Sequence, residues 1–249
     1  MREETLLDAL RETAAAVRRA LDGVADWGRA GTRPGQYEID LIADRVAVEV
    51  LDGAGLGVLS EESGLHDAER ELLAVLDPVD GSTNASRRLP WWATSVCVLD
   101  RRGPLAAVVV NQATGTRWEA VRGGGARCDG RTVAPSGCTR MADALVGLSG
   151  LPEHHLGWRQ FRAFGAAALD LCAVASGSLD AFVDCGLDAH GPWDYLGGLL
   201  ICTEAGAAAA DAGGRDLVVR DHEARRTPVA AATPDLLAEA LAALRPGSG

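Results

Sequence analysis

No run of about 18 or more uncharged apolar residues occurs in the 249-residue chain, so the sequence predicts no membrane span. Internal repeats and low-complexity linkers are also missing, which excludes solenoids and long flexible tethers. The first residues, MREETLLDALRETAAAVRRAL, form an amphipathic helical pattern that carries acids, and such a pattern is not a signal peptide. We therefore expect no membrane partner.

A basic surface is missing as well. Lys and Arg number 24 against 35 Asp and Glu, which gives a formal net charge of −11. Nucleic-acid phosphates require basic surfaces, so we expect no nucleic-acid partner. A surplus of carboxylates suits a protein that holds cations, although most acids of a globular protein are simply solvated.

The six cysteines form no Cys-x-x-Cys pair. Structural zinc sites usually show that spacing, so zinc is not expected. Several cysteines lie in apolar stretches such as TSVCVLD and LLICTEAG, and we interpret them as buried thiols in a reducing cytoplasm. They stand at Cys97, Cys128, Cys138, Cys172, Cys185 and Cys202.

The apolar fraction of 47% is enough for a sizeable core. Periodicity and turn signals predict helices over 3–28, 36–52 (after a short extended entry), 165–177 and 194–206, the last ending before Gly206. Buried strands are predicted over 55–60, 71–77, 142–150 and 179–186. An antiparallel run is predicted through 94–100, 104–112, 116–123 and 125–134, with a hairpin turn at Asp129-Gly130. Strands and helices on both sides of residue 140 predict a layered α/β architecture.

The stretch VLDPVDGSTN (75–84) places two acids at the end of an apolar strand. Pro78 removes a backbone donor and disfavours helix at Asp77, so we expect the chain to turn there. Gly81 permits backbone angles that other residues resist, and the Ser-Thr-Asn that follows is typical of a helix start. The pattern predicts a strand, a tight turn and a helix N-terminus.

Such a turn would aim Asp77, Asp80 and the carbonyl of Val79 at one point. Free amides at a helix start suit a phosphate, and oxygen ligands beside them suit magnesium. A bare DPVDG is equally compatible with a surface β-turn. An EF-hand requires acids at every second position, and the DxDx(T/V) loop of haloacid dehalogenase-type phosphatases has its second acid one residue earlier, so neither fits.

Two further acid sites follow the same pattern, in which an acid stands at the end of a strand or the start of a helix. SEESG (60–64) follows the apolar run GLGVL, and Asp194 opens the apolar helix in GPWDYLGGLLICTEAG (191–206). Taken singly, SEESG reads as a solvated loop, Asp194 as an ordinary N-cap and Trp193 as core. Taken together, the three sites predict acids that converge from separate elements.

In this order, EES at 61–63, DPVDGSTN at 77–84 and WDYLGGLLICTEAG at 193–206 resemble the inositol monophosphatase family of magnesium-dependent, lithium-sensitive phosphatases. The resemblance runs over nearly the whole chain and includes GARCDGRTV and GAAALDLCAVASG followed by LDAFVDC. The DPxDG(S/T)xN and WD…EAG motifs rarely occur together elsewhere. The resemblance implies an α/β (α+β) fold, a layered αβαβα sandwich of the inositol monophosphatase and sugar phosphatase type, assembled as a homodimer.

The resemblance also implies a site. Two Mg²⁺ ions, or three, would be held by Glu62, Asp77, the Val79 carbonyl, Asp80 and Asp194. The catalytic set would be Glu62, Ser82 (where the family has threonine) and Asp40, with Asp44 as the alternative to Asp40. The substrate would be bound by Asp80, Gly81, Ser82, Thr83, Gly165, Ala166, Ala167, Asp184 and Asp194.

Two departures from the family pattern are visible. The segment between Glu62 and Asp77 is short, and the link DCGLDAHGPWD (184–194) is longer than the family's connection from its substrate-contacting acid to the Trp-Asp pair. Asp184 matches that acid by order, while Asp188 and His190 are alternatives for the same space. The part of the pocket that contacts the leaving group therefore differs from the family pattern.

We expect one compact catalytic unit. Residues 1–139 form an α+β half with Glu62 and the DPVDGST motif, and residues 140–249 form an α/β half with the Trp-Asp motif. The expected function is Mg²⁺-dependent hydrolysis of a small phosphate monoester similar to inositol 1-phosphate, in the cytoplasm. The alternatives are the same chemistry on histidinol phosphate, fructose 1,6-bisphosphate, phosphoadenosine phosphate or NADP, and a catalytically silent metal-binding regulator.

Overall fold

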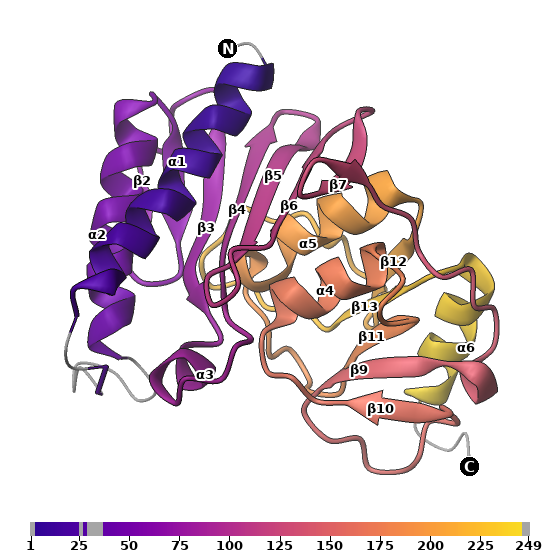
Figure 1. Cartoon of the computed structure of the whole chain (residues 1–249). Helices are drawn as coiled ribbons and strands as arrows, with labels where there is room; N and C mark the ends of the chain where they lie inside the picture. The colour runs from indigo at the N-terminus through magenta and orange to yellow at the C-terminus, as the bar shows by residue number, and fades with distance from the viewer. Residues whose placement is uncertain (1–2, 25–26, 29–36, 246–249) are drawn as a thin grey trace.

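The structure, a computed structural model, describes residues 3–24, 27–28 and 37–245. Helices and strands form alternating layers in it (Figure 1). The first sheet is eight-stranded, in the order β2-β1-β3-β4-β5-β6-β7-β8. β1 and β3 pair in parallel and the other neighbours pair antiparallel. The strands are β1 (Gly57–Ser60), β2 (Gly64–His66), β3 (Leu73–Asp80), β4 (Ala93–Asp100), β5 (Gly103–Asn111), β6 (Arg117–Val121), β7 (Gly125–Cys128) and β8 (Arg131–Thr132).

The second sheet is five-stranded, in the order β10-β9-β11-β13-β12. Its strands are β9 (Leu145–Ser149), β10 (Gln160–Arg162), β11 (Ala181–Asp184), β12 (Ala208–Asp211) and β13 (Pro228–Ala231). The first sheet therefore ends at residue 132 and the second begins at residue 145, so the expected division at 139/140 falls between them.

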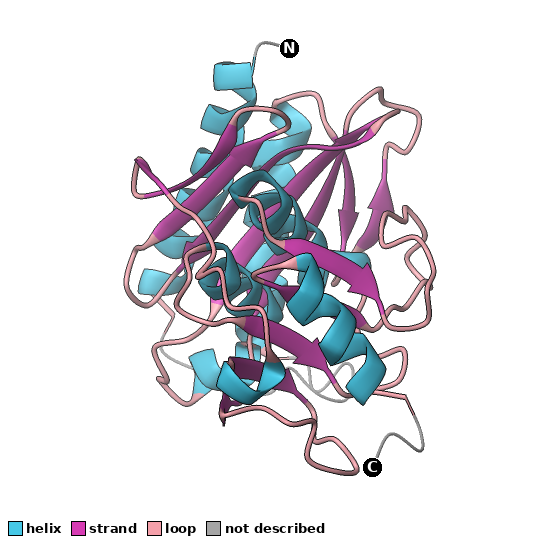
Figure 2. Cartoon of the chain, turned by 90° about the vertical axis from the view of Figure 1, so that its right-hand side faces the viewer, coloured by secondary structure: helices cyan, strands magenta, loops and turns pink. Residues whose placement is uncertain are grey.

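The helices cover both sheets. α1 (Glu3–Asp22) and α2 (Glu38–Gly53) pack on one face of the first sheet, while α4 (Ala167–Ala175) and α5 (Pro192–Ala205) lie between the sheets. α6 (Pro234–Ala243) packs on β13, on the far side of the second sheet (Figure 2). Every residue of α4 is buried, as expected for a helix with a sheet on each side. The predicted αβαβα sandwich is confirmed.

Three apolar clusters fill the spaces between these layers. One joins α1 and α2 to the first sheet, a second joins both sheets through α4 and α5, and a third lies between the second sheet and α6. The second cluster includes Tyr195, Leu196 and Phe182, all fully buried. Because α4 and α5 belong to the C-terminal half and pack on the N-terminal sheet, the two halves share one core.

The hairpin turn predicted at Asp129-Gly130 and the helix end predicted before Gly206 are confirmed. Asp129 and Gly130 have φ of 47° and 77°, as a two-residue hairpin turn requires. Gly206 has φ of 98° and closes α5 with its amide bonded to carbonyls of the last turn. The helix predicted over 3–28 ends at Asp22, and residues 25–26 lie outside the described part of the chain.

The turn expected at Pro78 is wrong. β3 continues through Pro78 to Asp80, and its register against β4 shifts between Asp77 and Asp80. Such an irregularity accommodates a proline, which cannot donate to the ladder. The sharp reversal comes at Gly81, whose φ is 85°, and the five-residue α3 (Ser82–Ser86) follows.

All six cysteines are free thiols. Cys97, Cys172 and Cys202 are buried as predicted, whereas Cys128, Cys138 and Cys185 are half-buried. No helix in the described part of the chain is both long and apolar enough to cross a membrane.

Candidate active site

Three carboxylates meet where the first sheet faces α5. Glu61 follows β1, Asp77 lies in β3, and Asp194 lies in the first turn of α5. One ligand oxygen from each lies within 4.8 Å of the others. The structure therefore brings together acids from three separate elements, as the sequence predicted for this region.

Strand register explains the place of Glu61. Ser60 pairs with Leu76 in the parallel β1–β3 ladder, and the Glu61 amide donates to the Leu76 carbonyl at 3.1 Å. The next position along β3 is Asp77, so Glu61 is its neighbour across the ladder. Asp77 itself is 1% exposed, and its Oδ1 accepts the Val79 amide at 3.0 Å.

The structure does not bring the predicted Glu62 into this cluster, and its role as a metal ligand stays a prediction. Within the described residues the carboxylate group contains Glu61 and not Glu62. The Glu62 amide turns back to the Ser60 hydroxyl at 3.4 Å, outside the ladder. Counting from the β1–β3 register would have selected Glu61, but that register is not visible in the sequence.

Burial and crowding raise the pKa values of these acids. Burial raises the pKa of Asp77 well above its ordinary value, and the charges of Glu61 and Asp80 raise it further. Burial, followed by the charge of Asp194, likewise raises the pKa of Glu61. A divalent cation would relieve this repulsion, and an all-carboxylate donor set fits a hard ion such as Mg²⁺. The residues present therefore fit the metal that the resemblance implies.

Asp80 lies beside this group and outside it. It is 8% exposed, and its Oδ2 accepts the Ala168 amide at 2.8 Å, at the start of α4. Burial and the charge of Asp194 raise the pKa of Asp80 to about 7, although the bond from Ala168 opposes the shift. Its predicted role as a metal ligand stays a prediction, as does that of the Val79 carbonyl.

The DGST loop (residues 80–83) packs against the loop before α4. A methyl group on Gly81 would come within 3.1 Å of the Gly165 carbonyl oxygen and 3.1 Å of the Ala166 Cβ. The Asn84 amide also donates to the Phe164 carbonyl at 2.7 Å. The predicted phosphate-binding segment 81–83 and the predicted substrate-binding segment 165–167 therefore lie side by side.

Asp40 and Asp44 have different surroundings. Asp40 is 4% exposed, its Oδ2 accepts the Tyr37 amide at 2.7 Å, and its charge raises the pKa of both Glu61 and Asp77. Asp44 instead accepts the hydroxyl of Ser60. Asp40 is thus the better placed of the two to act near the carboxylate group, and its role toward Ser82 stays a prediction.

Comparison with known proteins agrees with this geometry. A model of the inositol monophosphatase family matches residues 38–248. The chain belongs to the inositol monophosphatase family.

Two of its curated relatives are phosphatases by name. The chain is 34% identical over 207 residues to an inositol-1-monophosphatase of Mesorhizobium japonicum, covering 74% of this chain and 76% of the relative. It is 28% identical over 208 residues to a fructose-1,6-bisphosphatase of Pyrococcus furiosus, covering 83% and 82%. The solved structure of the extragenic suppressor protein SuhB from Bartonella henselae matches with a TM-score of 0.81 at 26% identity, covering 98% of each chain. This inositol monophosphatase family member is a phosphoric monoester hydrolase.

The long link 184–194 places Asp184 and His190 close to Asp194. Asp184 is fully buried, its Oδ1 accepts the Gly186 amide at 2.8 Å, and burial raises its pKa to about 6 against the opposing effect of His190.

His190 lies next to Asp194, with 3.2 Å between Nδ1 and Oδ2. Burial lowers the pKa of His190, but the hydrogen bond to Asp194 and the charges of the nearby carboxylates together outweigh it, and the pKa ends above its ordinary value. Asp188 forms an ion pair with Arg215.

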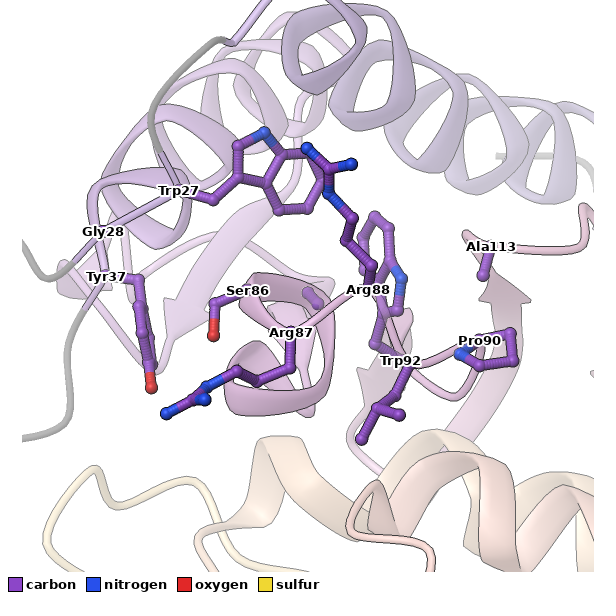
Figure 3. A pocket seen from close by; sticks show the side chains of 11 residues that line it. Trp27, Gly28, Tyr37, Ser86, Arg87, Arg88, Pro90, Trp92 and Ala113 are labelled. Atoms are coloured by element: carbon purple, nitrogen blue, oxygen red, sulfur yellow. The ribbon is translucent and has the colours of Figure 1, made fainter.

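A cavity of about 880 Å³ lies at the C-terminal end of α3 (Figure 3). Its walls include Trp27 and Trp92, edge to face with ring centroids 5.8 Å apart, and the guanidinium groups of Arg87 and Arg88. Its lining includes none of the clustered carboxylates. It touches the DGST motif through Tyr37, whose hydroxyl lies 3.3 Å from that of Thr83.

Proposed function

We propose that this protein hydrolyses a small phosphate monoester using Mg²⁺ held by Glu61, Asp77 and Asp194. The observation that carries this proposal is the convergence of these three carboxylates within 4.8 Å. Such crowding is costly without a cation, and it lies at the end of the strand that leads into the DGST loop. Glu61 replaces Glu62 in both proposed roles, ligand and catalytic residue.

These carboxylates would serve two ions: Glu61, Asp77 and the Val79 carbonyl would hold the first, and Asp77, Asp80 and Asp194 would hold the second. When bound, such ions stabilise charge on the phosphoryl and leaving oxygens and lower the pKa of water. The hydrogen bond from the Val79 amide fixes the orientation of the Asp77 carboxylate.

The remaining residues bind and orient. The amides of Gly81, Ser82 and Thr83 hold the phosphate. The Ser82 hydroxyl at the start of α3 orients the attacking water, and Asp40, buried near Glu61, supports that hydroxyl as a hydrogen-bond acceptor. Segment 165–167, in contact with Gly81, borders the leaving group.

An inositol 1-phosphate-like substrate is our first proposal, supported by the family and by the relative named inositol-1-monophosphatase. The relative named fructose-1,6-bisphosphatase favours a sugar bisphosphate as the second candidate. Histidinol phosphate, phosphoadenosine phosphate and NADP follow. Inhibition by lithium, a homodimer and a cytoplasmic location belong to the same proposal.

A turnover screen tests it. Wild-type protein and Asp77→Asn are incubated with a panel of these phosphates, with and without Mg²⁺, and released phosphate is measured. We expect Mg²⁺-dependent release by the wild type and none by the variant, because the shared ligand has lost its charge. Wild-type rates in a folded Asp77→Asn protein would reject the metal assignment, and no release from any ester would support the silent regulator.

A further inference from the structure

One carboxylate oxygen of Asp194 is occupied by hydrogen bonds within the protein. Its Oδ2 accepts the Gly191 amide at 2.8 Å and faces His190 Nδ1 at 3.2 Å. Within the described residues, no hydrogen bond reaches Oδ1. The carboxylate is therefore held by one edge, and Oδ1 remains for a cation.

His190 is itself fixed at both ring nitrogens. Its Nε2 lies 3.0 Å from the Ser149 hydroxyl at the end of β9. Its backbone forms a two-way bridge with Arg226, and the Phe182 ring packs edge-on at 6.4 Å between centroids. With its proton on Nδ1, the ring donates to Asp194 and accepts from Ser149. A ring held in this way can hold another group in place.

The same ring separates Asp194 from Asp184. Nε2 lies 3.8 Å from Asp184 Oδ1 while Nδ1 contacts Asp194. Asp184 is fully buried behind it, and its Oδ2 has no hydrogen-bond partner in the described structure. The long link 184–194 thus places an imidazole between the two acids.

We propose that His190 is a positioning residue that holds Asp194 for divalent-cation binding, and that Ser149 locks its ring. Hydrogen bonds of this kind orient ligands and raise metal affinity, and their loss typically costs about 10–100-fold in affinity. The inference rests on the proposed function for the identity of the metal, and it adds two residues and the purpose of the long link.

Two substitutions separate the two ring contacts. The amide nitrogen of His190→Asn can occupy the place of Nδ1 and still donate to Asp194, but it cannot reach Ser149. The amide of His190→Gln can occupy the place of Nε2 and meet Ser149, but it leaves Asp194 unsupported. His190→Ala removes both contacts, and Ser149→Ala removes one oxygen at the outer end.

Binding of Mn²⁺ alone, by calorimetry on the full chain without substrate, is the readout. Dissociation constants should rise at least about tenfold in His190→Ala and His190→Gln, and by less than about threefold in His190→Asn, with Ser149→Ala between them. At saturating Mg²⁺ the kcat of the alanine variant should recover, because a positioning defect is overcome by mass action. Asp188→Asn, in the same link, should bind Mn²⁺ like the wild type because its carboxylate pairs with Arg215.

Wild-type Mn²⁺ affinity in His190→Gln, or Asn as damaging as Ala, would overturn the proposal. If the His190 variants fail to fold, unchanged affinity in Ser149→Ala overturns it instead. Because Mn²⁺ binding is measured without turnover, a protein that hydrolyses no ester but shows this order of affinities would reject the proposed function and keep the inference.

Discussion

Replacing Asp80 by Asn should stabilise the metal-free protein. The carboxylate is buried at the end of β3, and burial together with the charge of Asp194 raises its pKa from 3.8 to about 7. An asparagine can still accept the Ala168 amide through its Oδ1, so the contact with α4 is kept. The substitution therefore removes the charge and little else.

The size and sign follow from proton linkage. The difference between 3.8 and about 7, at about 1.36 kcal/mol per pKa unit, corresponds to about 4 kcal/mol. The pKa of Asp80 is higher in the folded protein than in the unfolded chain. The corresponding stability is therefore fully present below about pH 4 and is lost as the pH rises through about 7. The raised pKa values of Asp77 and Glu61 act in the same direction.

Urea unfolding in EDTA at pH 5 and pH 8 measures the effect. Asp80→Asn should be more stable than the wild type at pH 8, by up to about 4 kcal/mol, and its stability should fall less between the two pH values. Asp22→Asn, an exposed acid at the end of α1, should change stability by less than about 0.5 kcal/mol. A destabilised Asp80→Asn protein at pH 8, or an unchanged pH dependence, would refute the reasoning.

Two further predictions concern the DGST loop. Ser82→Ala should lower kcat more than tenfold at unchanged Mg²⁺ affinity, because positioned proton-transfer groups contribute about 10²–10⁴-fold. Ser82→Thr keeps the hydroxyl and should be nearly neutral. Full kcat in the alanine variant would show that another residue orients the water. Gly81→Ala should cost about 1–3 kcal/mol in urea unfolding for its positive φ, and more for the contact with the Gly165 carbonyl. Gly115→Ala, at φ of 81° with no atom within 4 Å of the added methyl, isolates the strain, and an equal cost in both variants would show that the contact is unimportant.

Local signals made much of the fold predictable. The Asp129-Gly130 turn, the Gly206 helix stop and the apolar runs of β1, β3 and α4 are chemically distinctive. β2 and β10 have three residues each, and all of these residues are exposed or half-buried. Their sequence patterns are therefore too short to predict strands. β12 and β13 contain AAAD and PVAA, and alanine favours helix, so pairing between the strands decided against local propensity.

The site was predictable to the extent that it follows the chain. The DPVDG motif and the Trp-Asp pair indicated Asp77 and Asp194, which the structure brings together. The choice of Glu61 over Glu62 depends on the pairing of β1 with β3, and pairing register is a property of the fold. The contact of His190 with Ser149 joins residues 41 positions apart, across the link and β9, and no sequence spacing encodes it.

The most direct test of the central claim is Mg²⁺-dependent phosphate release by Glu61→Gln and Glu62→Gln, measured on the best substrate of the panel. The two variants remove the same charge from neighbouring positions, and the site contains only Glu61 of this pair within the described chain. We predict that Glu61→Gln abolishes release at any Mg²⁺ concentration used. Glu62→Gln should keep kcat within about threefold of the wild type, because a residue outside the carboxylate group makes no interaction specific to the transition state. Full activity in Glu61→Gln, or loss confined to Glu62→Gln, would contradict the account.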